Sequence, residues 1–309
     1  DQIENERVTN YFVSPLLLNF VFRKLKADNM FLTVTDLGNN LLQKNKLINK
    51  YIYYFHSPVS TTKNYTPQAF DNYDVILCNG KFQVDEIRLR ESLKKINKKK
   101  LIPTGYFYFD YLLENINPNF NSDEILIAPS WNKNMKNFIN EDFIELIEIM
   151  TKKNYKVIFR PHPEHFKRSR IVLEKIKKKF YNSSLRFDEG VNNINTMQSA
   201  KCLITDSSGI SIEYMFALKR PVLYLDEYDK IHNTEFYDYN NLITIDQKIK
   251  ENFGYLFKKK DFYKIDSIIN NSEIEFKKKL PELDSLISEN FYNFGNSKKF
   301  LISNLKDII

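Results

Sequence analysis

The amino-acid sequence predicts an α/β protein in which two Rossmann-like domains face a central cleft. With 309 residues, the chain exceeds the usual size of one domain and suits two. Short apolar segments alternate with amphipathic segments, as in a parallel, doubly wound sheet. A polar stretch at residues 114–123 separates two such periodic regions. We therefore assign residues 1–116 to an N-terminal domain, residues 117–290 to a C-terminal domain and residues 291–309 to a helix that packs back on the N-terminal domain.

The C-terminal half shows this alternation most clearly. Residues 140–152 have apolar side chains at helical spacing, and Asn140 suits the cap of this helix. Residues 166–180 predict a helix with a very basic outer face. The other expected helices are residues 195–200 and 209–218, and the expected strands are residues 125–130, 156–159, 185–187, 202–205 and 221–225. Because parallel sheets bind ligands at the carboxyl ends of their strands, the candidate site follows these strands.

The N-terminal half repeats the pattern less regularly. Its apolar segments predict strands at residues 30–34, 51–55, 75–78 and 100–103. This set is typical of a second Rossmann-like domain that lacks its first strand. The end of the chain is expected to be helical from Phe291.

The composition is typical of a folded protein without a membrane span. Hydrophobic residues make up 42% of the chain and charged residues 28%. The longest apolar stretch, residues 12–22, is too short and too interrupted to cross a bilayer. No leader opens the sequence, so we expect a cytoplasmic protein. Cys78 and Cys202 lie in apolar segments and are expected in the core without a disulfide.

The net charge of +7 comes largely from short lysine-rich runs. Such runs are typical of solvated helix faces. The alternative is attraction to a polyanionic substrate or peripheral contact with an anionic membrane, at its inner face. Nucleic acid is not an expected partner, because the runs are scattered and no familiar binding signature occurs. The runs are residues 94–100, 175–179, 258–260 and 277–279.

The motif RPHP follows a predicted strand and contains two candidate site residues, Arg160 and His162. Its prolines stiffen the turn, so both side chains would be fixed at the ligand-binding edge. Alternatively, Arg160 pairs with an internal carboxylate and His162 caps a helix. The spacing of His162 and His165 also allows a metal pair, but Pro163 disfavours the helical geometry and no third ligand is near in sequence. We expect no metal and no cofactor.

The motif TDSSG forms a second junction between a strand and a helix. It contains Asp206, Ser207, Ser208 and Gly209. Backbone amides and hydroxyls at a helix N-terminus form a phosphate site, although Ser and Asp are also ordinary helix caps. Glu213 lies one turn into this helix, where it could accept hydrogen bonds from ribose hydroxyls or face solvent.

Familiar catalytic motifs are absent from the sequence. Gly80 and Lys81 are followed by Phe82, so there is no P-loop, and no GxGxxG or GxSxG motif occurs. The sequence therefore does not support a kinase, a dehydrogenase or a serine hydrolase.

Taken together, RPHP, TDSSG, ILIAPSWN, EYMFALKRPVLYLD and FYNFGNSKKF resemble the CDP-glycerol glycerophosphotransferase family of teichoic-acid and capsule synthesis. The resemblance covers residues 51–300. FHSPVS at residues 55–60 stands where the family has His-Gly-Thr-Pro, with Ser57 in place of Gly. PTGYFYFDYL at residues 103–112 stands where the family has Gly-Tyr-Pro-Arg followed by Asp, with Phe-Tyr in place of Pro-Arg. TDSSG also lacks the aromatic residue that the family usually has before the serines.

This resemblance implies a GT-B fold, with the acceptor at the N-terminal domain and the nucleotide donor at the C-terminal domain. It implies transfer of glycerol phosphate, or a similar polyol phosphate, from a CDP-linked donor to a surface polysaccharide, a teichoic-acid-like chain or a lipid-linked acceptor, with release of CMP. His56 would be the general base, with Asp110 as the next candidate, and His162 would stabilise the donor phosphates. The implied donor site comprises Arg160, His162, Asp206, Ser207, Ser208, Gly209 and Glu213.

Two other functions remain open from the sequence. Bacterial sialyltransferases also have His-Pro and Ser-Ser elements, so the same pocket suits a glycosyltransferase that uses a CMP-activated acidic sugar. A non-catalytic nucleotide-binding module of a capsule assembly complex would show the same motifs.

Overall fold

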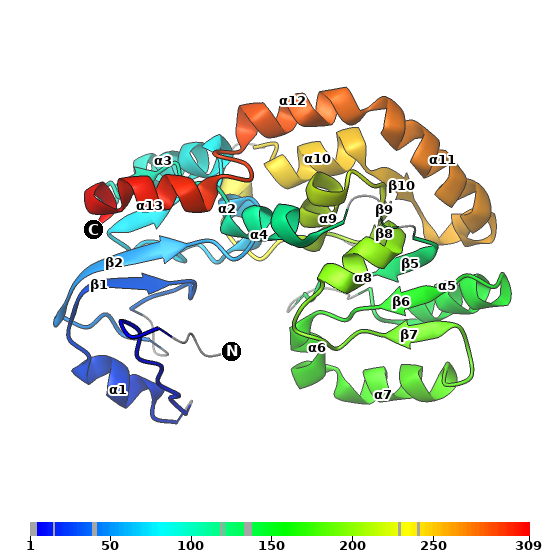
Figure 1. The fold of residues 1–309 in the computed structure, drawn as a ribbon, viewed down its shortest axis with the longest axis horizontal. Helices are drawn as coiled ribbons and strands as arrows, with labels where there is room; N and C mark the ends of the chain where they lie inside the picture. The colour runs from blue at the N-terminus through cyan, green and yellow to red at the C-terminus, as the bar shows by residue number, and fades with distance from the viewer. Residues whose placement is uncertain are drawn as a thin grey trace.

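The computed structural model shows two lobes, each built on one parallel sheet (Figure 1). The two parallel sheets confirm the predicted fold class. Residues 118, 119 and 121, within the predicted linker, lie outside the described part of the chain. The structure describes residues 5–14, 16–38, 42–117, 120, 122–132, 138–227, 230–239 and 242–309.

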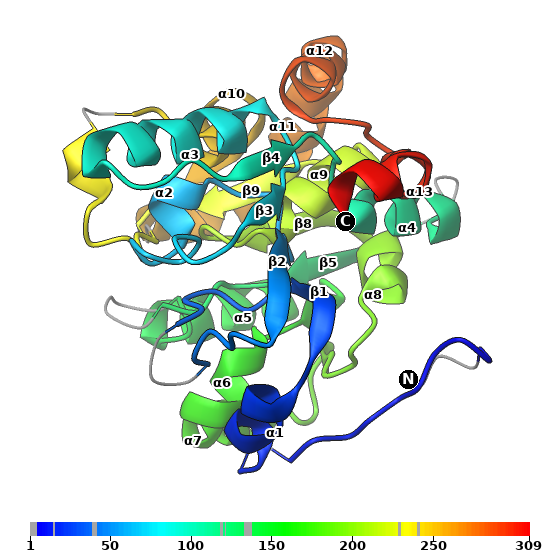
Figure 2. The same ribbon diagram turned by 90° about the vertical axis from the view of Figure 1, so that its left-hand side faces the viewer.

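The N-terminal lobe contains a four-stranded sheet with strand order β1-β2-β3-β4. Figure 2 shows β1 at the edge of this sheet, next to α1. The strands are β1 (Ala27–Leu32), β2 (Ile48–Tyr54), β3 (Val75–Leu77) and β4 (Lys100–Ile102). The helices of this lobe are α1 (Leu18–Lys24), α2 (Thr61–Asn64), α3 (Lys81–Lys94) and α4 (Phe107–Asn115).

The last helix, α13 (Ser297–Ile308), packs on the four-stranded sheet. Its Leu301 lies against a small apolar cluster that includes Ile52 of β2. The helix begins later than the predicted Phe291, because Phe291 pairs with Gly80 in an isolated antiparallel bridge. Residues 293 and 295 then adopt positive φ angles, which a helix does not accommodate.

The C-terminal lobe contains a six-stranded sheet with strand order β10-β9-β8-β5-β6-β7. The chain moves outward from β5 through β6 to β7 and then returns to β8 on the other side of β5. The winding therefore reverses between β5 and β8, where parallel sheets form a binding crevice. The strands are β5 (Glu124–Ile127), β6 (Val157–Phe159), β7 (Leu185–Phe187), β8 (Ala200–Thr205), β9 (Val222–Leu225) and β10 (Tyr255–Phe257).

The helices of this lobe agree with the sequence patterns, with one exception. Asn140 caps α5 as predicted, because its side chain accepts a hydrogen bond from the Asp142 backbone amide (2.8 Å). The single helix predicted at residues 166–180 is wrong: there are two helices that meet at Ser169, whose φ of −127° and ψ of 25° are not helical. The helices are α5 (Glu141–Lys152), α6 (Pro163–Arg168), α7 (Arg170–Lys179), α8 (Ile194–Ser199), α9 (Ile210–Leu218), α10 (Ile245–Phe253), α11 (Ile265–Lys278) and α12 (Leu280–Asn290), with 3₁₀ turns η1 (Phe236–Tyr239) and η2 (Lys259–Lys264).

The two lobes share an apolar core. Phe109 of α4 stacks on Phe216 of α9, with ring centroids 5.7 Å apart, and Phe291 meets Phe216 edge-on at 5.0 Å. Aromatic contacts of this kind add to the stabilisation that comes from burial. The core therefore fixes α9, which carries one of the two candidate motifs, against the N-terminal lobe.

Candidate active site

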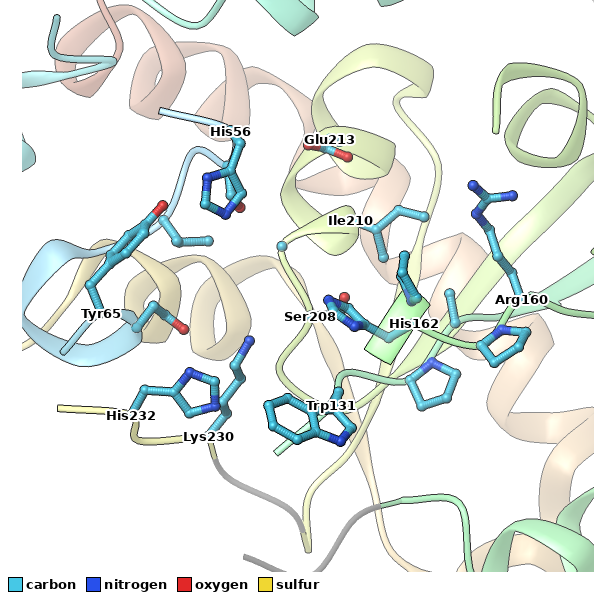
Figure 3. Close-up of a pocket in the computed structure, with 18 of the residues that line it drawn as sticks. His56, Tyr65, Trp131, Arg160, His162, Ser208, Ile210, Glu213, Lys230 and His232 are labelled. Carbon is cyan, nitrogen blue, oxygen red and sulfur yellow. The ribbon is translucent and has the colours of Figure 1, made fainter. Parts of the chain in front are cut away.

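A cavity of about 440 Å³ lies between the lobes, at the carboxyl ends of β5, β6 and β8. This is the crevice where the six-stranded sheet reverses its winding. Figure 3 shows His56 and Tyr65 on one side of the cavity and Ser208, His162 and Arg160 on the other. The candidate residues that line this first cavity are His56, Arg160, His162, Ser208, Gly209 and Glu213.

Arg160 follows β6 directly and is fixed by two contacts. Its backbone amide donates to the carbonyl of Ile127 (2.9 Å), which extends the sheet past the end of β6. Its Nη1 lies 2.6 Å from Oδ2 of Asp188, in a largely buried ion pair. Arg160 thus pairs with an internal carboxylate and also lines the cavity. Its guanidinium holds a positive charge at the wall in a fixed position.

His162 caps α6 and presents its second ring nitrogen for other contacts. Its Nδ1 accepts a hydrogen bond from the Glu164 backbone amide (3.2 Å). Burial, followed by the charge of Lys230, lowers the pKa of His162 to about 4. The ring is therefore neutral at pH 7, and because Nδ1 is the acceptor, the proton is on Nε2. A neutral Nε2–H is a hydrogen-bond donor suited to a phosphate oxygen.

The junction between β8 and α9 is held in place by Asp206. The Asp206 carboxylate accepts hydrogen bonds from the backbone amide and the hydroxyl of Ser130, both at 2.8 Å. These bonds tie the end of β8 to the end of β5, and Asp206 itself is buried and does not line the cavity. Ser208 and Gly209 lead into the first turn of α9, whose positive dipole end faces the cavity.

Gly209 lies at a close approach of the two lobes. A Cβ atom at this position would be 2.3 Å from the Ser57 hydroxyl, which belongs to the opposite wall. The absence of a side chain at Gly209 therefore lets the segment that carries His56 approach the start of α9.

Glu213 is linked to His56 through Tyr106. The Tyr106 hydroxyl lies 2.7 Å from Glu213 Oε1 and 2.9 Å from the backbone carbonyl of His56. Burial raises the pKa of Glu213 to about 7, although hydrogen bonding to Tyr106 opposes the shift. One hydroxyl proton serves only one acceptor at a time, so both contacts are hydrogen bonds when Glu213 is protonated and donates to Tyr106.

His56 lies at the N-terminal wall, with its ring exposed to the cavity. Its ring contacts Tyr65 edge-on, with centroids 5.9 Å apart. Withdrawal from bulk solvent, followed by the charge of Lys230, lowers the pKa of His56. A hydrogen bond with the Thr33 backbone acts in the opposite direction. His56 is therefore neutral at pH 7 and can accept a proton.

Sequence reasoning missed several residues of the cavity, among them Trp131, Lys230 and His232. Trp131 follows β5, and the guanidinium of Arg168 lies 5.1 Å from its ring centroid. Lys230 and His232 follow β9, and burial together with Lys230 lowers the pKa of His232 to about 4. All three lie after the end of a strand, which is the signal that could have found them.

Asp110, Ser207 and His165, which the sequence also singled out, lie outside the first cavity. Asp110 accepts hydrogen bonds from the backbone amides of Ser297 (3.1 Å) and Lys298 (2.7 Å), so it caps α13. Ser207 lines an adjoining cavity.

His165 is buried, with Nε2 3.1 Å from the Ser130 carbonyl and Nδ1 3.2 Å from the Ser169 hydroxyl. Both ring nitrogens are therefore engaged within the protein and leave no ligand for a metal. Across the described ranges, no three His, Cys, Asp or Glu side chains are grouped as a metal ion would require.

Comparisons with known proteins show which family and which folds the chain matches. The family described as CDP-Glycerol:Poly(glycerophosphate) glycerophosphotransferase matches residues 57–271. The minor teichoic acid biosynthesis protein GgaB of Bacillus subtilis (strain 168) is 25% identical over 209 residues, which cover 58% of this chain and 21% of GgaB. The match thus spans about a fifth of the length of that relative.

Solved structures show the same fold at low sequence identity. A variant of the wall teichoic acid polymerase TagF has a TM-score of 0.60 and 16% identity, with 91% of this chain and 73% of that chain covered. MnaA of S. aureus, solved with UDP, has a TM-score of 0.53 and 13% identity, with 84% and 70% covered. These two likenesses confirm the expected GT-B-like architecture.

Proposed function

The chain belongs to the CDP-glycerol:poly(glycerophosphate) glycerophosphotransferase family, and we propose that it transfers glycerol phosphate from a CDP-linked donor to a hydroxyl of a teichoic-acid-like or other surface polymer. One observation carries the proposal. The cavity sets the start of α9 and His162, which lie within the family match, opposite the neutral, exposed ring of His56, which precedes it. The wall formed by α9 and His162 suits a diphosphate, and the wall that carries His56 supplies a proton acceptor.

The C-terminal wall would bind the donor phosphates. Backbone amides at Ser208 and Gly209, the Nε2–H of His162 and the charge of Arg160 would all face the same anion. As the bond to CMP breaks, negative charge grows on the leaving phosphate. Donors already fixed around that charge stabilise the transition state without having to reorganise.

The N-terminal wall would activate the acceptor. The acceptor hydroxyl oxygen attacks the phosphorus that bears glycerol, and a new P–O bond forms while the P–O bond to the CMP phosphate breaks. His56 takes the hydroxyl proton and later gives it to solvent, and CMP leaves with the electron pair of the broken bond. The products are the acceptor extended by one phosphodiester-linked glycerol unit, CMP and one proton.

Tyr106 would position His56 for this step. Its hydroxyl holds the backbone carbonyl of His56 and touches Glu213 of the C-terminal lobe. Neither contact involves the reacting atoms, so Tyr106 and Glu213 act through the placement of His56.

We further propose peripheral contact with the inner face of an anionic membrane. Helix α7 places basic side chains of its last turn at the protein surface, including Lys178 and Lys179. Each well-placed lysine contributes about 1 kcal/mol near such a surface. Among the helices that the structure describes, none is long and apolar enough to cross a bilayer.

A donor panel tests the proposed reaction. The purified protein is incubated with a glycerol phosphate trimer and, in turn, with CDP-glycerol, CDP-ribitol, CMP-sialic acid or UDP-GlcNAc, while released nucleotide and product mass are measured. We expect the fastest release from CDP-glycerol, with the trimer extended by one unit. Release from CMP-sialic acid alone would indicate a glycosyltransferase instead. Tight CMP binding without turnover of any donor would indicate a non-catalytic nucleotide-binding module.

A further inference from the structure

A second cavity of about 390 Å³ adjoins the first. The two cavities share three wall residues, Asn64, Ser208 and Lys230. The remaining walls come from the end of β9, the segment around η1 and the first turns of α10. Lys230 also acts electrostatically on His56, so the shared wall is close to the proposed base. A ligand in the second cavity can therefore extend past this wall toward His56.

The charges that line the second cavity are balanced. Among the described residues, three carboxylates and three lysines line it, namely Asp226, Asp246 and Glu251 and Lys63, Lys230 and Lys250. Lys250 pairs with Asp226 at 2.8 Å, and Asp246 accepts a hydrogen bond from the Ser60 backbone amide at 2.9 Å. Because the lysines and carboxylates offset one another, the lining offers a phosphate little net attraction, whereas hydroxyl groups can donate hydrogen bonds to the carboxylates. The lining thus favours a neutral ligand with many hydroxyls.

An exposed aromatic side chain completes this wall. Tyr237 is 76% exposed, and its ring meets that of Phe236 edge-on, with centroids 5.5 Å apart. Gln247 adds an amide that donates to Glu251 at 2.8 Å. Aromatic faces that bury the C–H surface of a ligand, beside a few polar groups that fix its orientation, are the usual composition of a small-molecule site.

We propose that the second cavity binds the terminal glycerol or sugar unit of the acceptor and directs its hydroxyl past Ser208 and Lys230 to His56. The inference rests on the proposed function, because it names the position of the acceptor in that reaction. The donor phosphates then lie at the start of α9, between the nucleoside in the first cavity and the acceptor unit in the second.

Two substitutions that change only the second cavity test the inference. Gln247→Trp fills the cavity, and Tyr237→Ala removes its aromatic wall. Neither residue lines the first cavity. Tyr181→Ala is the matched control, because Tyr181 is similarly exposed (85%) and lines neither of these two cavities. For each protein, the binding of CMP and of a glycerol phosphate trimer is measured by calorimetry, together with the KM of the trimer in transfer from CDP-glycerol.

We expect Gln247→Trp to weaken trimer binding at least about tenfold and Tyr237→Ala about fivefold, with CMP affinity within about twofold of the unsubstituted protein. Equal weakening of CMP and trimer would show that the cavity holds the nucleotide, and this result overturns the inference. Unchanged trimer binding in both variants, or no trimer binding to the unsubstituted protein, also overturns it. Since calorimetry does not require turnover, these outcomes are distinguishable from failure of CDP-glycerol as the donor.

Discussion

The two walls of the first cavity differ in how their side chains are held. On the C-terminal wall, His162 is fixed by its own helix, Arg160 by Asp188 and the α9 junction by Asp206. On the N-terminal wall, the His56 ring is exposed, and its backbone carbonyl accepts a hydrogen bond from the hydroxyl of Tyr106. The C-terminal wall is organised by contacts within its own lobe, whereas the residue that holds the His56 backbone, Tyr106, also contacts Glu213 of the other lobe.

This difference suits two different tasks. A diphosphate is bound best by groups that need no rearrangement, because fixed dipoles stabilise charge without reorganisation. A general base needs access to an incoming hydroxyl and a neutral ring at working pH. We therefore expect substitutions on the C-terminal wall to act mainly on nucleotide affinity and those on the N-terminal wall to act mainly on turnover.

The largest expected effect is that of His56→Ala. Loss of a positioned base commonly lowers the rate about 10²- to 10⁴-fold, so transfer from CDP-glycerol should fall by this factor. CMP affinity, measured by calorimetry, should stay within about twofold, because His56 acts on the acceptor. Near-normal transfer by His56→Ala would show that the N-terminal wall does not supply the base through His56. The general base would then be another residue.

The next effect concerns Glu213, which connects the two walls through Tyr106. Its pKa is raised from 4.5 to about 7 by burial. The folded state therefore favours the protonated carboxyl, and this contribution to stability is fully present below pH 4.5 and lost as the pH rises through about 7. A shift of this size corresponds to on the order of 3 kcal/mol.

Glu213→Gln isolates this contribution. The free energy of unfolding of both proteins is measured in urea from pH 5 to pH 8. Glu86, whose burial also raises its pKa to about 7, titrates in both proteins and cancels in the difference. We expect Glu213→Gln to gain relative stability as the pH rises. Parallel curves would show that Glu213 is ionised in the folded protein. In that case Glu213 would not donate a hydrogen bond to Tyr106, and the proposed link between the two walls would be wrong.

A smaller effect, on affinity, is expected for His162. His162→Asn keeps a side-chain acceptor that suits the cap of α6 but removes the Nε2–H donor. Hydrogen bonds to charged groups contribute about 1.5–3 kcal/mol, so CMP affinity should fall at least about tenfold. The melting temperature, measured by calorimetry without ligand, should remain close to that of the unsubstituted protein. Unchanged CMP affinity would limit His162 to its capping role.

Local chemistry made part of the site predictable from the sequence. RPHP and TDSSG follow strands directly, and a residue after a parallel strand reaches the ligand-binding edge in any doubly wound sheet. Arg160, His162 and Ser208 are therefore close together in the structure, from segments about 45 residues apart in the sequence, whereas His56 on the opposite wall was expected only from the family resemblance. The cap at Asn140 was predictable for the same reason, because a capping side chain acts within its own turn.

The remaining features depend on contacts between distant segments. Lys230 and His232 follow β9 without any motif, and their segment is tied to the N-terminal lobe by a hydrogen bond from the His232 backbone amide to the Lys63 carbonyl. The link between Tyr106 and Glu213 joins the two lobes. Such pairings are set by tertiary packing, which neither periodicity nor spacing encodes.

The smallest expected effect is that of Asp110→Ala. This substitution should lower the free energy of unfolding without changing the rate of transfer. Asp110 accepts hydrogen bonds from the first two amides of α13, so its loss should lower the free energy of unfolding by about 1 kcal/mol, as for other helix caps. Transfer per folded molecule should be unchanged, because Asp110 does not line the first cavity. Asp110→Asn, which keeps an acceptor oxygen, is the control and should recover most of the stability. A loss of transfer of about 10²-fold or more, at a temperature where Asp110→Ala is folded, would instead make Asp110 the base in place of His56.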